Sequence, residues 1–183
     1  ASDLSYTAGA TVANRLDNME VGTLALLRAM TSAQLAVGDV VTVVSTGARL
    51  QVKSGNVTQL AGIREPFTDA PTTTYAEVMR EGDWSLGWCE PTADGVADDQ
   101  ALIQAFVDDV ETLGGGNIKA DPNLTYGLGS AVTLGASGTE VFIGSFGKNG
   151  ARFKALSAFT GGMFIELAGG LMGAELEGFA FAT

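Results

Sequence analysis

Hydrophobic and polar positions follow two different rhythms along the chain, and these rhythms predict one amphipathic helix followed by many short strands. Between residues 99 and 113, apolar residues recur every three or four positions, which is the spacing of one face of an α-helix. Asp98 and Asp99 stand at its start, where carboxylates can accept the free backbone N–H groups. The apolar stripe consists of Leu102, Ile103, Phe106, Val107, Val110 and Leu113.

Three glycines follow this helix and predict its end, because glycine readily adopts the left-handed conformation that stops a helix. Beyond them the apolar clusters are short, and three of them recur at a spacing of 23 residues: Ile118, 141–143 and 164–167. Such a period is typical of stacked coils in a parallel β-helix. The remaining clusters are expected to form the other faces of each coil: 124–126, 132–134, 152–154 and 176–181.

The apolar strand expected at residues 178–183 carries no polar cap. A solenoid whose last coil is uncapped recruits another chain at its edge. We therefore expect the natural polypeptide to continue, with residues 83–183 forming a truncated solenoid.

A small α+β module is predicted over residues 21–65. Thr23 can cap a short helix that runs through Met30. Residues 40–44 are β-branched and suit a buried strand, whereas 50–53 alternate as a half-exposed strand, and a turn then leads into 57–60.

The segments that flank this module are expected to be less compact. Residues 66–82 contain prolines and several threonines and indicate a linker, in which Thr74 and Glu77 have the spacing of a helix capping box and Gly82 can end a short helix. Residues 1–20 contain too little apolar surface to fold alone, so we expect this connector to pack on neighbouring chains as a trimer stem.

Aromatic residues mark the expected mouth of the solenoid. Trp84 and Trp88 alternate with smaller residues as in a strand. They could stack on sugar rings, but plugging the core of the solenoid together with Phe106 is the simpler role.

Charge and composition exclude several function classes. The formal net charge of −11 opposes binding to nucleic acid or to anionic membranes, so neither is expected as a partner. The chain has no histidine and one cysteine, Cys89, which removes Ser-His-Asp and Cys-His catalysis as well as thiolate zinc sites. No apolar run is long enough to span a membrane.

The acidic residues have structural explanations that compete with catalytic ones. Asp94, Asp98 and Asp99 could form the carboxylate pair of a glycosidase, yet Asp94-Gly95 fits a turn and Asp98-Asp99 fits a helix start. Their spacing is not that of a calcium-binding loop. We therefore predict no catalytic residue, no metal ligand and no cofactor in this chain. Residues 108–111 are interpreted as the solvated face of the helix.

The residues from Asp94 to the triple glycine resemble the opening of a known fold. The run Asp-Gly-x-x-Asp-Asp over 94–99, the helix after it, and Gly114, Gly115 and Gly116 are similar to the start of the pectate-lyase-like right-handed β-helix of bacteriophage tailspikes and tail fibres. Phosphate-binding glycines precede a helix, whereas these three follow one, which excludes a nucleotide site. Pro122 and Tyr126 also match the family pattern, but the glycine expected between them is absent.

This resemblance implies a mainly β fold in which a small N-terminal α+β module is followed by a short helix and the first coils of a right-handed parallel β-helix. It also implies a homotrimeric virion protein that docks onto the phage tail, baseplate or an adaptor protein. Its distal part, beyond this chain, would bind and perhaps cleave a host surface polysaccharide. Two alternatives remain open: an adhesive tail fibre without catalysis, and a secreted polysaccharide lyase or hydrolase.

Overall fold

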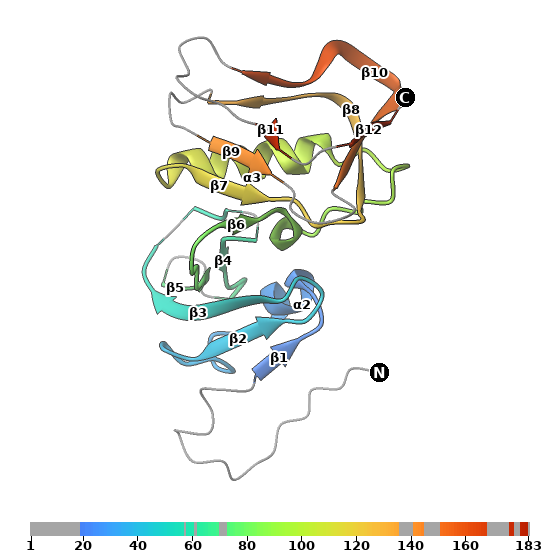
Figure 1. Cartoon of the computed structure of the whole chain (residues 1–183). Coiled ribbons are helices and arrows are strands. Elements are labelled where there is room, and N and C mark those ends of the chain that lie inside the picture. Colours follow the sequence, from blue (N-terminus) through green and yellow to red (C-terminus); the bar gives the residue numbers. More distant parts are fainter. Residues whose placement is uncertain are drawn as a thin grey trace. The chain divides into compact units, whose positions relative to one another are not determined.

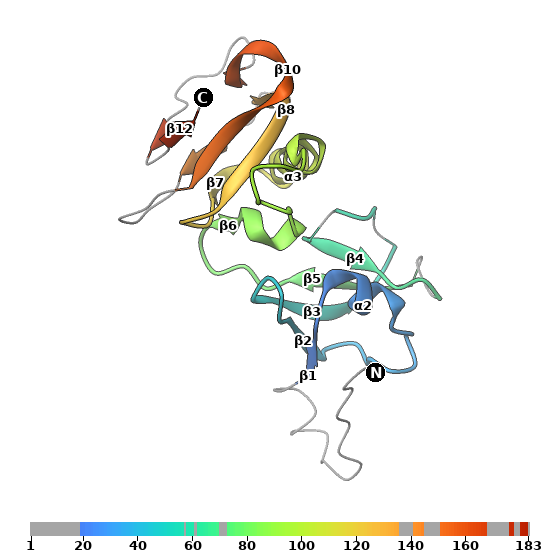
Figure 2. The same cartoon turned by 90° about the vertical axis from the view of Figure 1, so that its right-hand side faces the viewer.

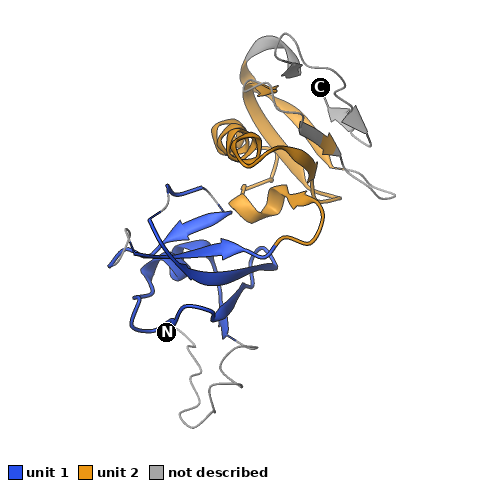
Figure 3. Ribbon diagram, turned by 90° about the vertical axis from the view of Figure 1, so that its left-hand side faces the viewer, with its two compact units in different colours: residues 1–79 blue, residues 80–183 orange. Residues whose placement is uncertain are grey.

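The computed structural model describes residues 19–56, 58–60, 62–69, 73–135, 141–144, 151–167, 176–177 and 180–182. The chain divides into two compact units, residues 1–79 (unit 1) and 80–183 (unit 2), which Figure 3 colours blue and orange. The expected connector over 1–20 lies outside the described residues except for its last two positions, which belong to the first strand.

Unit 1 is built around a five-stranded sheet in the order β1-β2-β3-β5-β4 (Figure 1). The first pair is parallel and the other pairs are antiparallel. The helix α2 (Leu24–Ala29) lies against this sheet and buries Leu24 and Leu27. The strands are β1 (Met19–Val21), β2 (Val40–Val43), β3 (Ala48–Ser54), β4 (Arg64–Pro66) and β5 (Thr74–Val78).

Several sequence predictions for unit 1 are confirmed. The Thr23 side chain accepts a hydrogen bond from the N–H of Leu26, so it caps α2 as expected. The two predicted strands correspond to β2 and β3. Residues 58–60 form no strand, because the chain turns there and Leu60 makes only a single bridge with Arg64.

The short helix predicted from Thr74 to Gly82 is wrong. Residues Thr74–Val78 form β5, which lies between β3 and β4 and is hydrogen-bonded to both. A two-turn helix is marginal by itself, whereas a central strand gains hydrogen bonds on both edges and buries alternate side chains such as Ala76. This part of the expected linker therefore belongs to the sheet of unit 1.

Unit 2 contains two sheets in which every strand pair is parallel. One has the order β11-β9-β7-β6 and the other β12-β10-β8 (Figure 1). The first sheet comprises β6 (Trp84–Ser85), β7 (Gly116–Lys119), β9 (Val141–Gly144) and β11 (Leu176–Glu177). The second comprises β8 (Thr125–Leu134), β10 (Arg152–Leu167) and β12 (Ala180–Ala182).

Each successive strand is added to the same side of its sheet, but the spacing differs from the predicted one. Ile118 pairs with Ile143, 25 residues later, whereas Trp84 pairs with Ile118, 34 residues later. Residues 164–167 do not continue the sheet of Ile118, because they belong to β10 and lie beside β8. Strand pairing tolerates connections of different length, so a fixed period of 23 is wrong while the stacking of parallel strands is present. Among the described residues no sheet closes on itself, and the right-handed β-helix stays a prediction.

The helix α3 (Gln100–Thr112) runs beside β8, as Figure 2 shows almost along the helix axis. Ile103, Phe106, Val107 and Val110 of the predicted stripe are buried, while Leu102 and Leu113 remain partly exposed. The core also contains Tyr126 and Phe153, whose ring centroids lie 5.7 Å apart. Within the described ranges no helix is both long and apolar enough to cross a membrane.

Candidate functional site

Asp99 lies buried between the loop before α3 and the strand β8. Its carboxylate accepts hydrogen bonds from the backbone N–H groups of Thr92 at 2.8 Å, Ala93 at 3.1 Å and Gly127 at 3.3 Å. Its own N–H donates to the carbonyl of Gly127 at 2.8 Å. The expectation that this carboxylate caps α3 is wrong, because it joins two separate segments instead.

The neighbouring aspartates serve turns and the helix start. Asp98 accepts from the N–H of Gln100 at 3.0 Å, as predicted, and also from the N–H of Gly129 at 2.9 Å. Asp94 accepts from the N–H groups of residues 96 and 97, which forms the predicted turn at Gly95. These backbone hydrogen bonds hold the pKa of the Asp94 carboxyl below its usual value.

Polar side chains of α3 continue this pattern along β8. The side-chain amide of Gln100 donates to the carbonyl of Ala131 at 2.8 Å. Gln104 both accepts from the N–H of Thr133 at 2.7 Å and donates to its carbonyl at 2.9 Å. Glu111 is buried, and its carboxylate accepts from the N–H of Gly135. The interpretation of Glu111 as part of a solvated face is therefore wrong.

Together these contacts form a hydrogen-bond ladder along the outer edge of β8, with one partner at every second residue from Thr125 to Gly135. It begins where the N–H of Thr125 donates to the carbonyl of Ala93. β8 is the last strand of its sheet, and an uncovered edge strand invites pairing with another chain. The ladder closes this edge with side chains in place of a further strand. Its side-chain members are Asp98, Asp99, Gln100, Gln104 and Glu111.

Two glycines of β8 make this close approach possible. A Cβ at Gly127 would collide with the backbone carbonyl of Ala97, and a Cβ at Gly129 would collide with the carboxylate of Asp98. The first obstacle is backbone and cannot rotate away, whereas the second is the end of a side chain. The two positions therefore differ in how much they tolerate a methyl group.

We expect Gly127→Ala to lower the free energy of unfolding by about 2–3 kcal/mol and Gly129→Ala by about 1 kcal/mol, because overpacking costs more where neighbours cannot move. Urea unfolding of both variants, followed by tryptophan fluorescence, measures the difference. A larger loss for Gly129→Ala than for Gly127→Ala would contradict this explanation.

The expected plug of the solenoid is divided between two environments. Trp84 and Phe106 are buried, and the Trp84 indole N–H donates to the carbonyl of Gly115 at 3.1 Å. Trp88 is only half-buried, because the strand ends at Ser85 and residues Leu86–Cys89 form a 3₁₀ turn (η1). The two indole rings meet edge to face at 6.3 Å between centroids. Their role in a solenoid cap stays a prediction.

The three glycines after α3 adopt positive φ angles of 98°, 79° and 121° at Gly114, Gly115 and Gly116. The N–H groups of Gly114 and Gly115 donate to carbonyls of the last turn of α3, which they terminate in this way.

Cys89 is buried at the end of the 3₁₀ turn, and burial raises the pKa of its thiol to about 12. The thiolate is the reactive form, so native Cys89 should react with iodoacetamide at pH 8 at least about 100-fold more slowly than the same thiol in 8 M urea. Mass spectrometry of timed samples measures both rates. Equal rates would show that this turn opens readily in the native state.

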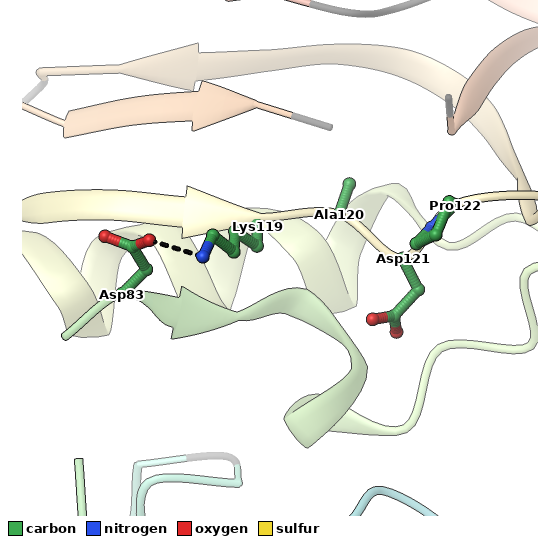
Figure 4. A pocket seen from close by; sticks show the side chains of 5 residues that line it. All are labelled: Asp83, Lys119, Ala120, Asp121 and Pro122. Carbon is green, nitrogen blue, oxygen red and sulfur yellow. Dashed lines mark ion pairs between the residues drawn. The ribbon is translucent and has the colours of Figure 1, made fainter. Parts of the chain in front are cut away.

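An open pocket lies beside β7 and is lined by Asp83, Lys119, Ala120, Asp121 and Pro122 (Figure 4). The Lys119 ammonium group pairs with the Asp83 carboxylate at 2.8 Å, and the Asn117 amide donates to the same carboxylate at 3.2 Å. Side-chain hydrogen bonding by Lys119 holds the pKa of Asp83 below its usual value. The Asp121 carboxylate points away from this pair. Sequence reasoning missed this pocket, because its residues belong to two strands that are far apart in the chain.

The described residues contain no group of three or more cysteine, aspartate or glutamate side chains arranged to hold a metal ion. Asp94, Asp98 and Asp99 do lie in one region, but each binds backbone N–H groups.

No protein-family model matches this sequence, and no curated protein matches it either. Solved structures do match, at probability 1.00. Tailspike protein 2 of Escherichia coli O157:H7 bacteriophage CAB120 has a TM-score of 0.64 and 14% identity, over 89% of this chain and 20% of that one. The tailspike of Acinetobacter baumannii phage AM24 has a TM-score of 0.56 and 12% identity, over 87% of this chain and 32% of that one.

A third match is the tailspike gp49 of Acinetobacter baumannii bacteriophage Fri1, a capsular polysaccharide depolymerase, with a TM-score of 0.52 and 15% identity. It covers 90% of this chain and 40% of that one. This chain therefore spans between a fifth and two fifths of these tailspikes. It has a mainly β fold similar to that of phage tailspike proteins, as its sequence predicts.

Proposed function

We propose that this chain is the virion-proximal and solenoid-nucleating part of a trimeric phage tailspike or tail fibre. The observation that carries the proposal is the match to several tailspikes over 87–90% of this chain, which is more residues than either unit contains. The location in the virion and the trimer are part of the proposal.

The ladder along β8 supports the nucleating role. It covers one edge of the sheet, while β10 and β12 follow on the other edge in sequence order. The sheet of β6 is extended in the same order by β7, β9 and β11. Strands can therefore be added in one direction only, which is what the first coil of a right-handed β-helix requires.

The proposed partner of the whole protein is a host surface polysaccharide. One of the matched tailspikes is a capsular polysaccharide depolymerase, which supports this substrate class. We assign no catalytic residue to this chain, since the carboxylates that the sequence offered for catalysis are engaged with backbone N–H groups. Any cleavage would belong to residues outside the described part.

Immunogold labelling of purified virions with an antibody against residues 80–183 tests the proposal. Label on the tail is expected, together with a band on a denaturing gel that is heavier than the 183-residue chain. Light scattering of that native polypeptide should give three copies. Antigen that is secreted and absent from virions would overturn the proposal and favour a secreted polysaccharide-degrading enzyme.

A further inference from the structure

We propose that the pocket beside β7 is a binding site for an uncharged or amino sugar residue, with Asp121 as the principal hydrogen-bond acceptor. The inference rests on the proposed function, because it names a polysaccharide contact within the virion-proximal segment. Nothing in the sequence pattern marks this pocket, and its walls come from β6, η1 and β7.

Asp121 is held in place from two sides. Its backbone N–H donates to the buried hydroxyl of Tyr126 at 3.1 Å. Its carboxylate lies directly over Gly87, where a Cβ would collide with Oδ2. The absence of a side chain at residue 87 therefore leaves the space that this carboxylate occupies.

The Asp121 carboxylate is half-buried, yet within the described residues no hydrogen bond or ion pair reaches it. Burial raises the pKa of this carboxyl, as expected for an acid that has lost water without gaining donors. A partly desolvated acceptor without a donor is energetically unfavourable and is a natural contact for a ligand that brings O–H or N–H groups.

The rest of the pocket selects the class of ligand. Lys119 is already paired with Asp83, so Asp121 leaves the pocket with a net negative charge, which disfavours phosphates and acidic sugars. A metal ion would need more ligands than the pocket offers. The pocket is open and has charged walls, whereas cofactor sites are usually enclosed and apolar.

A sugar ring meets these conditions, because it offers several hydroxyl donors to Asp121 and acceptors to Lys119 and Asn117. The Ser85 hydroxyl lies 3.6 Å from the position that a Cβ of Gly87 would occupy, so it adds a further polar group beside the Asp121 carboxylate. A single ring of this size is expected to bind with a dissociation constant of about 1 mM.

The two tryptophans of the chain, Trp84 and Trp88, provide the measurement. Trp88 adjoins Gly87 and is half-buried, so a ligand over Asp121 should change its emission. We would titrate the 183-residue chain with the methyl glycosides of glucose, galactose and glucosamine, and with methyl glucuronide. Saturable quenching by at least one of the first three is expected, with binding of the glucuronide at least about tenfold weaker.

Asp121→Asn should weaken binding at least about tenfold, as expected for loss of a hydrogen bond to a charged group. Gly87→Ala should weaken it similarly while keeping the charge, because the new methyl group displaces the carboxylate. Asp108→Asn, an exposed aspartate on α3, is the matched control and should bind like the original chain. Circular dichroism of each variant verifies that it is folded.

No quenching by the three glycosides, equal affinity of Asp121→Asn, or equal binding of the glucuronide would each overturn the sugar site. These results are independent of the virion experiment. Label on the tail without sugar binding would reject the pocket and retain the proposed function, whereas sugar binding by a secreted protein would do the reverse.

Discussion

Replacing Asp99 with alanine is expected to lower the free energy of unfolding of unit 2 by about 3–5 kcal/mol. The change leaves the N–H groups of Thr92, Ala93 and Gly127 without their acceptor in a buried site. An unsatisfied buried donor costs about 1–3 kcal/mol, and the three losses are not fully additive. Urea unfolding followed by tryptophan fluorescence measures the effect in unit 2, because both tryptophans lie there.

Asp108→Ala is the control for this experiment. Asp108 is exposed on α3 and lies outside the ladder, so its loss should change stability by no more than about 0.5 kcal/mol. Similar losses for Asp99→Ala and Asp108→Ala would show that the ladder contributes little to folding. In that case the proposed nucleating role would lose its physical basis.

Glu65→Ala is expected to destabilise unit 1 by about 3–5 kcal/mol. Glu65 in β4 is 1% exposed and accepts two hydrogen bonds of 2.7 Å from the guanidinium group of Arg28 on α2. Gln59 and the N–H of Gly62 donate to the same carboxylate. Truncation would leave a cation and two further donors without their acceptor. Hydrogen exchange of the β2 and β3 amides measures the loss within unit 1.

Two further variants separate the burial of charge from the loss of packing. Glu77, which pairs with Lys53 and Arg64, has a side chain that is 18% exposed, so Glu77→Gln should cost only about 1 kcal/mol. The double variant Arg28→Met/Glu65→Met should recover much of the stability, because apolar side chains of similar size can replace a buried ion pair. A double variant as unstable as Glu65→Ala would indicate that these particular hydrogen bonds are indispensable.

Local sequence patterns predict the elements whose causes are local. The cap at Thr23, the helix α3 with its buried stripe and the stop at the three glycines all depend on residues within a few positions of one another. The turn at Asp94 is of the same kind. In each case a side chain contacts backbone of its own turn, so the pattern of residues is sufficient to predict the contact.

Contacts between distant segments are where sequence reasoning fails. Thr74 and Glu77 have the spacing of a capping box, but pairing with β3 and β4 makes them part of a strand. Gln100 and Gln104 look like ordinary polar positions of a helix until β8 is placed beside them. Asp99 and Glu111 were expected at a helix end and on a solvated face, yet each binds backbone of β8 or its end.

The sequence by itself determined the positions of the helices and turns, the parallel character of the region after the triple glycine and its likeness to tailspikes. These follow from hydrophobic periodicity and from residues that satisfy neighbouring backbone groups. Only the tertiary structure decided the strand register, the ladder along β8 and the pocket of Asp83, Lys119 and Asp121. The physical reason is that an edge strand needs partners wherever the fold places them, and no local pattern records which distant side chains will provide them.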